Sequence, residues 1–321
     1  MKKIANLTII LILCLNLLAV PAFGRELMAG GQVIGLELAD NTVTVADFDG
    51  DEKNAARAAG LQVGDRIEKI DGKAVRCAED IRQALHCSKG CVELTVLRQG
   101  KRHALRAVPA ITAEGPKLGI YLKQGVTGIG TVTWYDPETG AFGTLGHGVN
   151  DPAGRPVAMV SGNAYKARVV GVIPGRSGKP GQLQGAVTAG QTIGKLRRNT
   201  PMGVFGALEE GFDGQLLPVA EAGQIRTGPA VIRSTVEGTT PRDYSVEILK
   251  IYPGSTAQGR NLMLKITDPA LLEITGGIVQ GMSGSPIIQD GKLVGAVTHV
   301  LVNDPTRGYG ILIENMLEAA S

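Results

Sequence analysis

The stretch that decides the fold runs from Gly281 to Val297 and reads GMSGSPIIQDGKLVGAV. Its second half places an Asp290-Gly291 turn between two apolar segments, and this pattern predicts a β-hairpin. Its first half crowds glycines around Ser283, and glycine allows the tight bends that turn several backbone N–H groups toward one point. Such a group of donors is suited to stabilising a negatively charged oxygen. The stretch therefore predicts a β-rich fold that presents a serine at a tight turn.

A glycine-rich serine turn followed by a hairpin resembles the nucleophile region of chymotrypsin-like serine proteases. In the frame G-x-S-G-x-P, Ser283 occupies the position of the nucleophile, and Ser285 stands where that class usually has glycine. The resemblance implies that the backbone N–H groups of Gly281 and Ser283 form an oxyanion hole. A glycine-rich β-turn with incidental serines is the alternative that the motif alone leaves open.

The composition of the whole chain favours a mainly β protein. The chain has 45 glycines among 321 residues and only 4% aromatic residues. Segments such as 128–134 and 244–251 alternate with the period of two that is typical of strands, and no long helical pattern appears before 311–320. We predict a pair of packed β-barrels over residues 115–321. The formal net charge of +3, from 33 basic and 30 acidic residues, is too balanced to indicate a nucleic-acid partner.

The first 24 residues have the pattern of a targeting segment. Lys2 and Lys3 precede an apolar run over 4–20, and Val20-Pro21-Ala22 is similar to a small-residue cleavage site. The same run is long enough to span a bilayer if it is not removed. In both cases the two lysines stay on the cytoplasmic side. We expect residues 1–24 to be a signal peptide or a membrane anchor and the remainder to be extracytoplasmic.

Residues 30–108 are predicted to form one module of strands and two short helices. The sequence over 59–72, AGLQVGDRIEKIDG, is similar to bacterial PDZ domains. The resemblance implies binding of an extended peptide by strand addition, often at its C-terminal carboxylate. It places the peptide-binding residues at Val33, Ile34, Gly35 and Leu36. A PDZ fold that serves only as a packing spacer is the alternative. Proline-marked residues 108–115 are the predicted linker to the region 115–321.

A nucleophilic serine needs a base held close to it, and histidine is the usual one. The chain has four histidines, of which His86 and His103 lie in the PDZ-like module. His147 lies between two glycines after an apolar strand, where an imidazole can face a cleft. His299 lies within the strand that follows the hairpin turn. His147 is therefore the predicted base, with His299 as the alternative.

The third member of a serine protease triad is a carboxylate that orients the histidine. The residues alone leave Asp136, Asp151, Asp243 and Asp268 as candidates. Chymotrypsin-like enzymes have the chain order His, Asp, Ser. That order removes only Asp136 and leaves the other three open.

Several further stretches resemble the stage IV sporulation protein B family, the sporulation signalling serine peptidases of endospore-forming Firmicutes. They are TLGH at 144–147, NDP at 150–152, ITDP at 266–269, GGIVQGMSGSP at 276–286 and GAVTHVLVNDPT at 295–306. The resemblance implies Ser283 as nucleophile, His147 as base and Asp268 as the orienting acid. Asp268 precedes Ser283 by only 15 positions, which departs from the long separation usual in chymotrypsin-like enzymes.

The resemblance also implies a biological role. A member of this family is made in the forespore and acts between the two membranes around it. It cleaves the extracytoplasmic part of a membrane-bound regulator, which releases an intramembrane protease that activates a late mother-cell sigma factor. Family members also cleave themselves near the N-terminus. The PDZ module is expected to recognise peptide tails of the target or of a sister molecule, so self-association is an open expectation.

Two other functions fit parts of the sequence. A periplasmic-type quality-control protease is one, although such enzymes usually carry the protease domain before the PDZ domain. A PDZ-based adaptor with an inactive protease-like domain is the other, and the presence of His147, Asp268 and Ser283 together opposes it. No cofactor or metal is predicted, because Cys87, Cys91 and His86 supply too few ligands for a structural zinc site.

Overall fold

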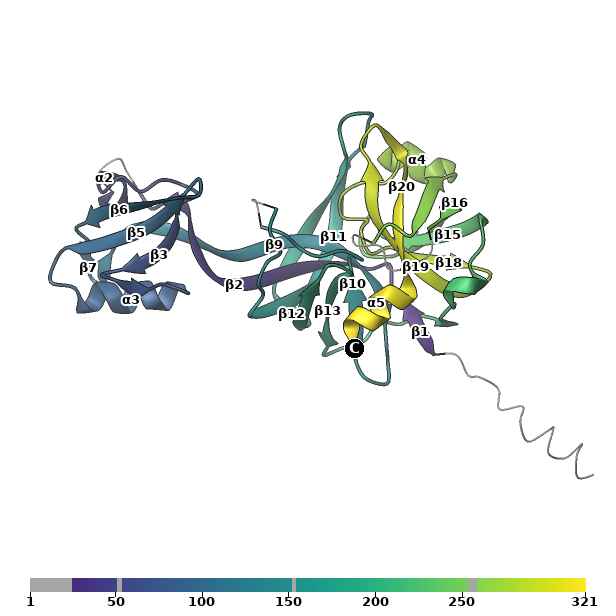
Figure 1. The fold of residues 1–321 in the computed structure, drawn as a ribbon, viewed down its shortest axis with the longest axis horizontal. Coiled ribbons are helices and arrows are strands. Elements are labelled where there is room, and N and C mark those ends of the chain that lie inside the picture. The colour runs from purple at the N-terminus through teal and green to yellow at the C-terminus, as the bar shows by residue number, and fades with distance from the viewer. Residues whose placement is uncertain (1–24, 51–53, 152–153, 253, 255–258) are drawn as a thin grey trace, which may run out of the picture.

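The computed structural model describes residues 25–50, 54–151, 154–252, 254 and 259–321, so the expected targeting segment at 1–24 lies outside it. A small module and a pair of β-barrels are joined by a ribbon of two long strands (Figure 1). The predicted mainly β fold, with a PDZ module and a double-barrel peptidase region, is confirmed. Within the described ranges, no helix is long and apolar enough to cross a membrane.

The PDZ module has its own apolar core and a local ion pair. Its elements are the second half of β2 (Val33–Phe48), α2 (Ala55–Ala58), β3 (Arg66–Ile70), β4 (Lys73–Ala74), α3 (Ala78–Cys87), β5 (Val92–Arg98), β6 (Lys101–Ala107), β7 (Ala110–Thr112), β8 (Gly115–Lys117) and the start of β9 (Ile120–Tyr135). Asn54 caps α2 by accepting hydrogen bonds from two backbone N–H groups. Buried Asp65 accepts two hydrogen bonds from Arg98, at 2.7 and 2.6 Å, which explains the Asp of the PDZ motif.

The first barrel is a closed ring of six strands. Strand pairings run from β9 to β10, β13, β12, β11, β2 and back to β9. The strands not yet given are β10 (Ala141–Thr144), β11 (Ser161–Ile173), β12 (Gln182–Thr200) and β13 (Gly203–Leu208). Alternating residues of β2, Ile34, Leu36 and Leu38, point into its core, as the period of two requires.

The second barrel is also closed, in the order β15–β16–β17–β20–β19–β18. Its strands are β15 (Gly228–Ser234), β16 (Arg242–Ile251), β17 (Leu262–Ile266), β18 (Pro286–Gln289), β19 (Lys292–Leu301) and β20 (Asp304–Leu312), with α4 (Pro269–Thr275) between β17 and β18. The predicted hairpin is confirmed as β18–β19. Its turn residues Asp290 and Gly291 both have positive φ, 50° and 73°, which is typical of a tight hairpin turn.

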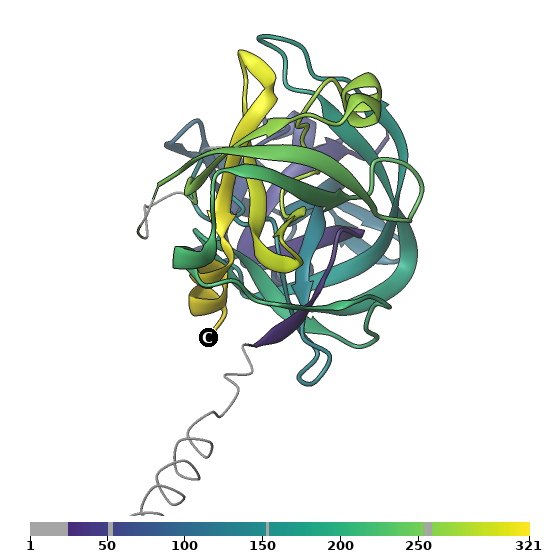
Figure 2. The ribbon, with the colours of Figure 1, turned by 90° about the vertical axis from the view of Figure 1, so that its right-hand side faces the viewer.

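A third apolar cluster joins the two barrels. Trp134 and Phe205 of the first barrel pack in one cluster with Leu293 and Ile311 of the second and with Met316 of α5 (Ile313–Ala320). The remaining elements are β1 (Glu26–Ala29), β14 (Leu216–Pro218) and the short helix η1 (Ala222–Gln224). The view from the barrel end shows α5 beside the first residues of the described chain (Figure 2). The barrels are therefore held by packing as well as by chain connection.

The PDZ module is inserted into the first barrel through β2 and β9. Residues Val33–Leu38 of β2 pair with β9 on one side, and most of them also pair with β11 on the other, so the first half of β2 belongs to the barrel. The second half, from Val43, pairs with β3 of the PDZ module. We expected the PDZ module to span 30–108. The pairings place its start inside β2 and its end inside β9.

Candidate active site

The nucleophile turn is shaped by two glycines with left-handed backbone. Gly281 and Gly284 have φ of 97° and 94°, on either side of Met282 and Ser283 in the loop between α4 and β18. A Cβ atom on Gly284 would lie 2.1 Å from the Thr131 carbonyl oxygen of the first barrel. Only glycine therefore fits at this position, for both conformation and space.

The two serines of the turn have different surroundings. Ser285 is fully buried, and its hydroxyl donates a hydrogen bond of 2.9 Å to Ser234 Oγ. Ser283 is half-buried and lines a cleft of about 540 Å³. Its hydroxyl donates a hydrogen bond of 2.9 Å to the Thr298 carbonyl oxygen. Ser283 therefore reaches the cleft and Ser285 does not, and the role of Ser283 as the nucleophile stays a prediction.

His147 enters the same cleft from the first barrel. It follows β10 after two residues with positive φ, Leu145 and Gly146, at 69° and 68°. Its Nδ1 lies 2.9 Å from the Gly148 carbonyl oxygen, so Nδ1 carries the proton and Nε2 is left as the acceptor. Burial lowers the pKa of His147 below its usual value, and the Gly148 carbonyl opposes this only in part. The ring is therefore neutral at pH 7, as a general base must be.

The two residues of the predicted oxyanion hole also lie at the cleft. Gly281 and Ser283 both line it, and neither of their backbone N–H groups donates a hydrogen bond within the described chain. Both groups are free to bind an oxyanion, and their role as an oxyanion hole stays a prediction. The structure gives no hydrogen bond between the Ser283 hydroxyl and the His147 ring in the part that it describes, since the hydroxyl is bonded to Thr298. Rotation of the serine side chain is needed before attack.

His299 is a neighbour of the predicted base. The two imidazole rings have centroids 5.3 Å apart and are tilted by 41°. His299 also lines the cleft, and its buried Nδ1 has no hydrogen-bond partner in the described residues. Burial, together with the charges of His147 and Arg260, lowers the pKa of His299 to about 4. His299 is thus a neutral wall of the cleft beside His147. The sequence indicated His299 only as an alternative base.

Asp268 lies elsewhere in the fold. Its carboxylate is the N-cap of α4 and accepts hydrogen bonds from Leu271 N–H, at 3.0 Å, and from Ser245 N–H, at 3.2 Å. It does not line the cleft, and no contact with His147 is found among the described residues. The structure brings Ser283 and His147 together and leaves Asp268 on the helix cap. The orienting role of Asp268 stays a prediction.

The predicted peptide-binding residues of the PDZ module need a correction. Val33, Ile34 and Leu36 are buried, and Gly35 pairs with Tyr165 of β11 on one side and Ile129 of β9 on the other. A peptide cannot add to a strand that already has two neighbours. Within the PDZ module, Ile120–Gln124 of β9 pair only with β2 in the described chain, so this segment carries a free strand edge. The sequence over 118–120, LGI, is the signal that could have indicated it.

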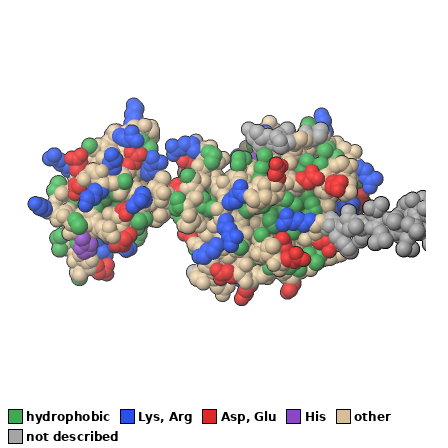
Figure 3. All heavy atoms as spheres, turned by 60° about the horizontal axis from the view of Figure 1, so that its bottom comes forward, with side chains coloured by type: hydrophobic (Ala, Val, Ile, Leu, Met, Phe, Trp, Pro, Cys, Tyr) green, Lys and Arg blue, Asp and Glu red, His purple; other side chains and the backbone are tan. Residues whose placement is uncertain are grey.

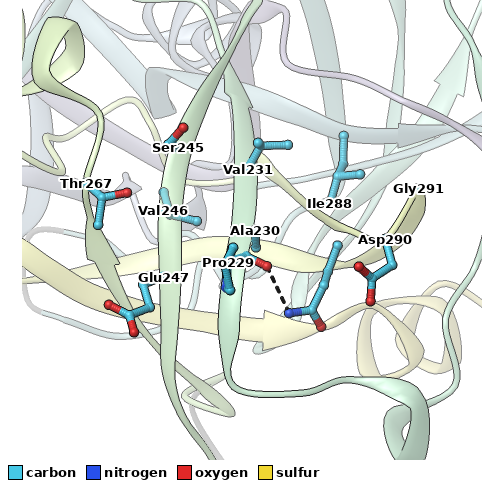
Figure 4. Close-up of a pocket in the computed structure, with 11 residues that line it drawn as sticks. Pro229, Ala230, Val231, Ser245, Val246, Glu247, Thr267, Ile288, Asp290 and Gly291 are labelled. Carbon is cyan, nitrogen blue, oxygen red and sulfur yellow. Dashed lines mark hydrogen bonds between the residues drawn. The ribbon is translucent and has the colours of Figure 1, made fainter.

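A second cavity of about 500 Å³ lies on the second barrel, between β15, β16 and the β18–β19 turn. There β15 and β18 separate, and the Gln289 amide bridges them by donating to the Pro229 carbonyl (Figure 4). Neither His147 nor Ser283 lines this cavity. The part of the chain that is described holds no group of three side chains able to bind a metal.

The surface agrees with a balanced charge. On the face drawn in Figure 3, acidic and basic side chains are interspersed over both the PDZ module and the barrels.

Comparisons with known proteins cover parts of the chain. Over 92 residues it is 36% identical to the putative zinc metalloprotease Atu1380 of Agrobacterium fabrum, which is 28% of this chain and 23% of that protein. The chain thus spans about a quarter of that curated relative. The PDZ domain of the SdrC-like protein Lmo2051 from Listeria monocytogenes is 26% identical, over 26% of this chain and 87% of that one, with a TM-score of 0.23.

A larger share of the chain is similar to a solved protease, the inactive form of Rv3671c. That match has 12% identity over 60% of this chain and 84% of the protease, with a TM-score of 0.35. Residues 50–98 match the model of the PDZ domain. Residues 114–317, well over half of the chain, match the model of the SpoIVB peptidase S55 family. With a serine and a histidine from opposite barrels meeting in one cleft, the chain belongs to the SpoIVB peptidase S55 family and is a serine peptidase with a PDZ domain.

Proposed function

We propose that Ser283 is the nucleophile and His147 the general base of an endopeptidase whose oxyanion hole is formed by Gly281 and Ser283. The observation that carries this proposal is the cleft shared by the half-buried Ser283 and the neutral His147. A substrate peptide would lie with its scissile carbonyl oxygen toward the two free N–H groups.

The reaction follows from this arrangement. The Ser283 hydroxyl turns from Thr298 and gives its proton to His147 Nε2 as its oxygen bonds to the scissile carbonyl carbon. The carbonyl becomes an oxyanion held by the Gly281 and Ser283 N–H groups. The imidazolium then protonates the leaving amine, and the acyl-enzyme is hydrolysed by a water molecule that His147 deprotonates. In this structure the Gly148 carbonyl fixes the tautomer of His147 that the first step needs.

The biological role that we propose is sporulation signalling. The chain would cross the forespore membrane through residues 1–24 and act between the membranes. There it would cleave the extracytoplasmic part of a membrane-bound regulator of an intramembrane protease, and so trigger activation of a late mother-cell sigma factor. Membership of the S55 family and the PDZ module support this proposal. We also propose that the enzyme cleaves itself near its N-terminus.

Self-cleavage gives the direct test. The purified chain is incubated and its N-terminal trimming is followed on a gel, beside Ser283→Ala and with labelling by a fluorophosphonate probe. We expect trimming and labelling in the parent chain and neither in the variant. Equal trimming in both would indicate a contaminating protease. Absence of both signals from the parent chain would favour an adaptor with an inactive protease-like domain.

The role of Asp268 can be tested without disturbing its helix. Asn caps helices about as well as Asp, so Asp268→Asn keeps the N-cap of α4. A fall in kcat of about 10⁴-fold would assign the orienting role to Asp268. A rate within a few-fold of the parent would leave that role to the Gly148 carbonyl.

A quality-control protease is the second enzymatic alternative. Such an enzyme degrades unfolded proteins broadly. Digestion of unfolded casein to many fragments would therefore favour it, whereas cleavage restricted to one or a few sites would favour signalling.

A further inference from the structure

We propose that the free edge of β9 is one continuous docking track, which holds the C-terminal end of an extended substrate in the PDZ module and leads the same chain into the catalytic cleft. The proposal rests on the peptidase function proposed above. It predicts a fixed spacing between the cleavage site and the C-terminus of the substrate.

At the barrel end, the track begins at the nucleophile. Thr131 N–H donates a hydrogen bond of 3.0 Å to the Ser283 carbonyl, on the side of β9 away from β2. The register with β2 is uninterrupted from Thr131 back to Val126. Since backbone groups alternate in direction along a strand, Ile129 and Thr127 present their N–H and C=O groups to the same side as Thr131. That side has no strand partner in the described chain before Val132, where β10 begins to pair.

Gly128 and Ile129 also line the cleft that holds Ser283 and His147. A Cβ atom built on Gly128 meets nothing within 4 Å, so there is open space over the face of the strand at this point. A glycine in a strand often marks a place where another backbone approaches closely. The unpaired part of β9 therefore borders the cleft at Gly128 and Ile129.

At the PDZ end, the same edge is also unpaired. Asp49 N–H donates to the Gly119 carbonyl, so the backbone of the next residue, Ile120, points to the edge away from β2. Helix α3 packs in one apolar cluster with Ile120 and Leu122 of this segment. One of its ends is fixed where the His86 ring packs on Gly115, and the other where Gln124 Nε2 lies 3.4 Å from the Arg76 carbonyl. The edge and α3 thus form the two walls that a strand-adding peptide needs.

The two ends belong to one edge because β2 stays on one side of β9 throughout. Between the PDZ and barrel registers, β2 makes a detour of four residues, 39–42, while β9 inserts only Gly125. Gly125 has φ of 73°, and a Cβ atom there would lie 1.8 Å from the Leu38 carbonyl oxygen. The longer irregularity is therefore in β2, and β9, the strand proposed to pair with substrate, is interrupted only by Gly125. Figure 1 shows β9 running without a break from the PDZ module to the barrels.

The chain direction that the PDZ site imposes on a peptide also leads it toward the catalytic cleft. A carboxylate bound by backbone N–H groups at Leu118–Ile120 lies at the start of β9, so a peptide that pairs with β9 from there must run antiparallel to it. Its preceding residues then follow β9 toward Thr131 and Ser283. Antiparallel pairing matches residues one to one except at a bulge, and the inserted Gly125 is why Ile120 and Ile129 face the same edge. Nine positions separate Ile120 from Ile129, so the scissile bond is expected about ten residues before the C-terminus of the substrate.

A peptide library tests this spacing without altering the protein. The full chain is incubated with a mixture of peptides of 15 to 30 residues, roughly the length that spans the track at about 3.3 Å per residue, and cleavage sites are read by mass spectrometry. We expect the distance from cleavage site to C-terminus to cluster at about ten residues. Adding two residues to the C-terminus of a cleaved peptide should move the preferred site by two, and C-terminal amidation should reduce cleavage at least tenfold. Sites that ignore the position and charge of the C-terminus would overturn the track.

A binding measurement makes the test complete if cleavage is slow. In Ser283→Ala, a 20-residue peptide with a free carboxylate should slow hydrogen exchange of the amides of Ile120, Thr127 and Ile129 together, and its amide should not. Protection confined to Ile120 would overturn the continuous track and leave a separate PDZ site. A parent chain that neither cleaves any peptide nor reacts with a fluorophosphonate would instead refute the proposed peptidase function.

Discussion

The two barrels reach the same six-stranded closure by different routes. The second barrel uses six strands that follow one another between Gly228 and Leu312. The first uses strands spread from Val33 to Leu208, with the whole PDZ module inserted between two that pair. Ser283 belongs to the locally connected barrel, and His147 to the one that depends on distant pairings. The proposed nucleophile is thus built by one short region, while the proposed base depends on pairings spread over most of the chain.

The largest effect is expected from the nucleophile of the second barrel. Ser283→Ala should lower kcat by about 10⁴-fold or more, as for loss of a triad serine generally, with little change in the unfolding temperature. Ser285→Ala is the matched control, because Ser285 is buried and bonded to Ser234. It should retain activity and lose about 1 kcal/mol of stability. Comparable loss of activity in both variants would contradict the assignment.

The seam between the barrels is expected to be the next most sensitive place. Gly284→Ala adds a Cβ against the Thr131 carbonyl and strains a left-handed residue. We expect a loss of about 3 to 5 kcal/mol in the free energy of unfolding, measured with denaturant. Gly291→Ala has a positive φ but open space around it, so it should lose only about 1 kcal/mol. Equal losses would show that the clash is relieved by movement of the barrels.

A smaller loss, confined to the inserted module, should follow from Asp65→Ala. This change leaves Arg98 without its buried partner and should destabilise the PDZ module by about 3 kcal/mol. Glu114→Ala, which removes an exposed ion pair with Lys117, should have no measurable effect. The measurement is amide hydrogen exchange of the full chain, with the exchange rates of the PDZ module and of each barrel compared. Loosening of the second barrel in Asp65→Ala would show that the module and the barrels are one cooperative unit.

The smallest expected effect is a shift of the pH profile. Protonation of His147 would abolish the proposed function as base, and burial holds the pKa of His147 below the usual 6.5. Activity should therefore persist as pH falls through 6.5 and be lost only at lower pH, as seen in kcat/KM. The acidic limb of the profile, where activity is lost, should remain at the same pH in His299→Gln, since the pKa of His299 is about 4. A limb at or above pH 6.5 would mean that His147 is more exposed than the structure shows.

Local signals predicted the elements of the fold well. The hairpin after Ser283, the short helices of the PDZ module and the C-terminal helix are each encoded by neighbouring residues, through turn glycines and periodicity. The division of β2 could not be predicted. Its apolar alternation is the same in both halves, and only pairing with residues more than 100 positions away places Val33–Leu38 in the barrel.

The same distinction holds for the site. Ser283 and His147 stand in glycine-rich turns that the sequence displays directly, and the structure brings both into one cleft. The neighbouring position of His299 and the helix-capping hydrogen bonds of Asp268 depend on how β19 and α4 pack, which no short motif encodes. The free edge of β9 was missed for the same reason, because an edge is defined by the absence of a partner.

The ribbon has a consequence for the modular design of the chain. Leu38 and Val126 stand directly opposite each other on paired strands, at the point where the PDZ module begins and ends. Cα atoms so paired are about 5 Å apart, a gap that a two-residue hairpin turn closes. The module is therefore a cassette. It can be excised, or exchanged for another domain with adjacent termini, while both barrels keep every one of their own strands.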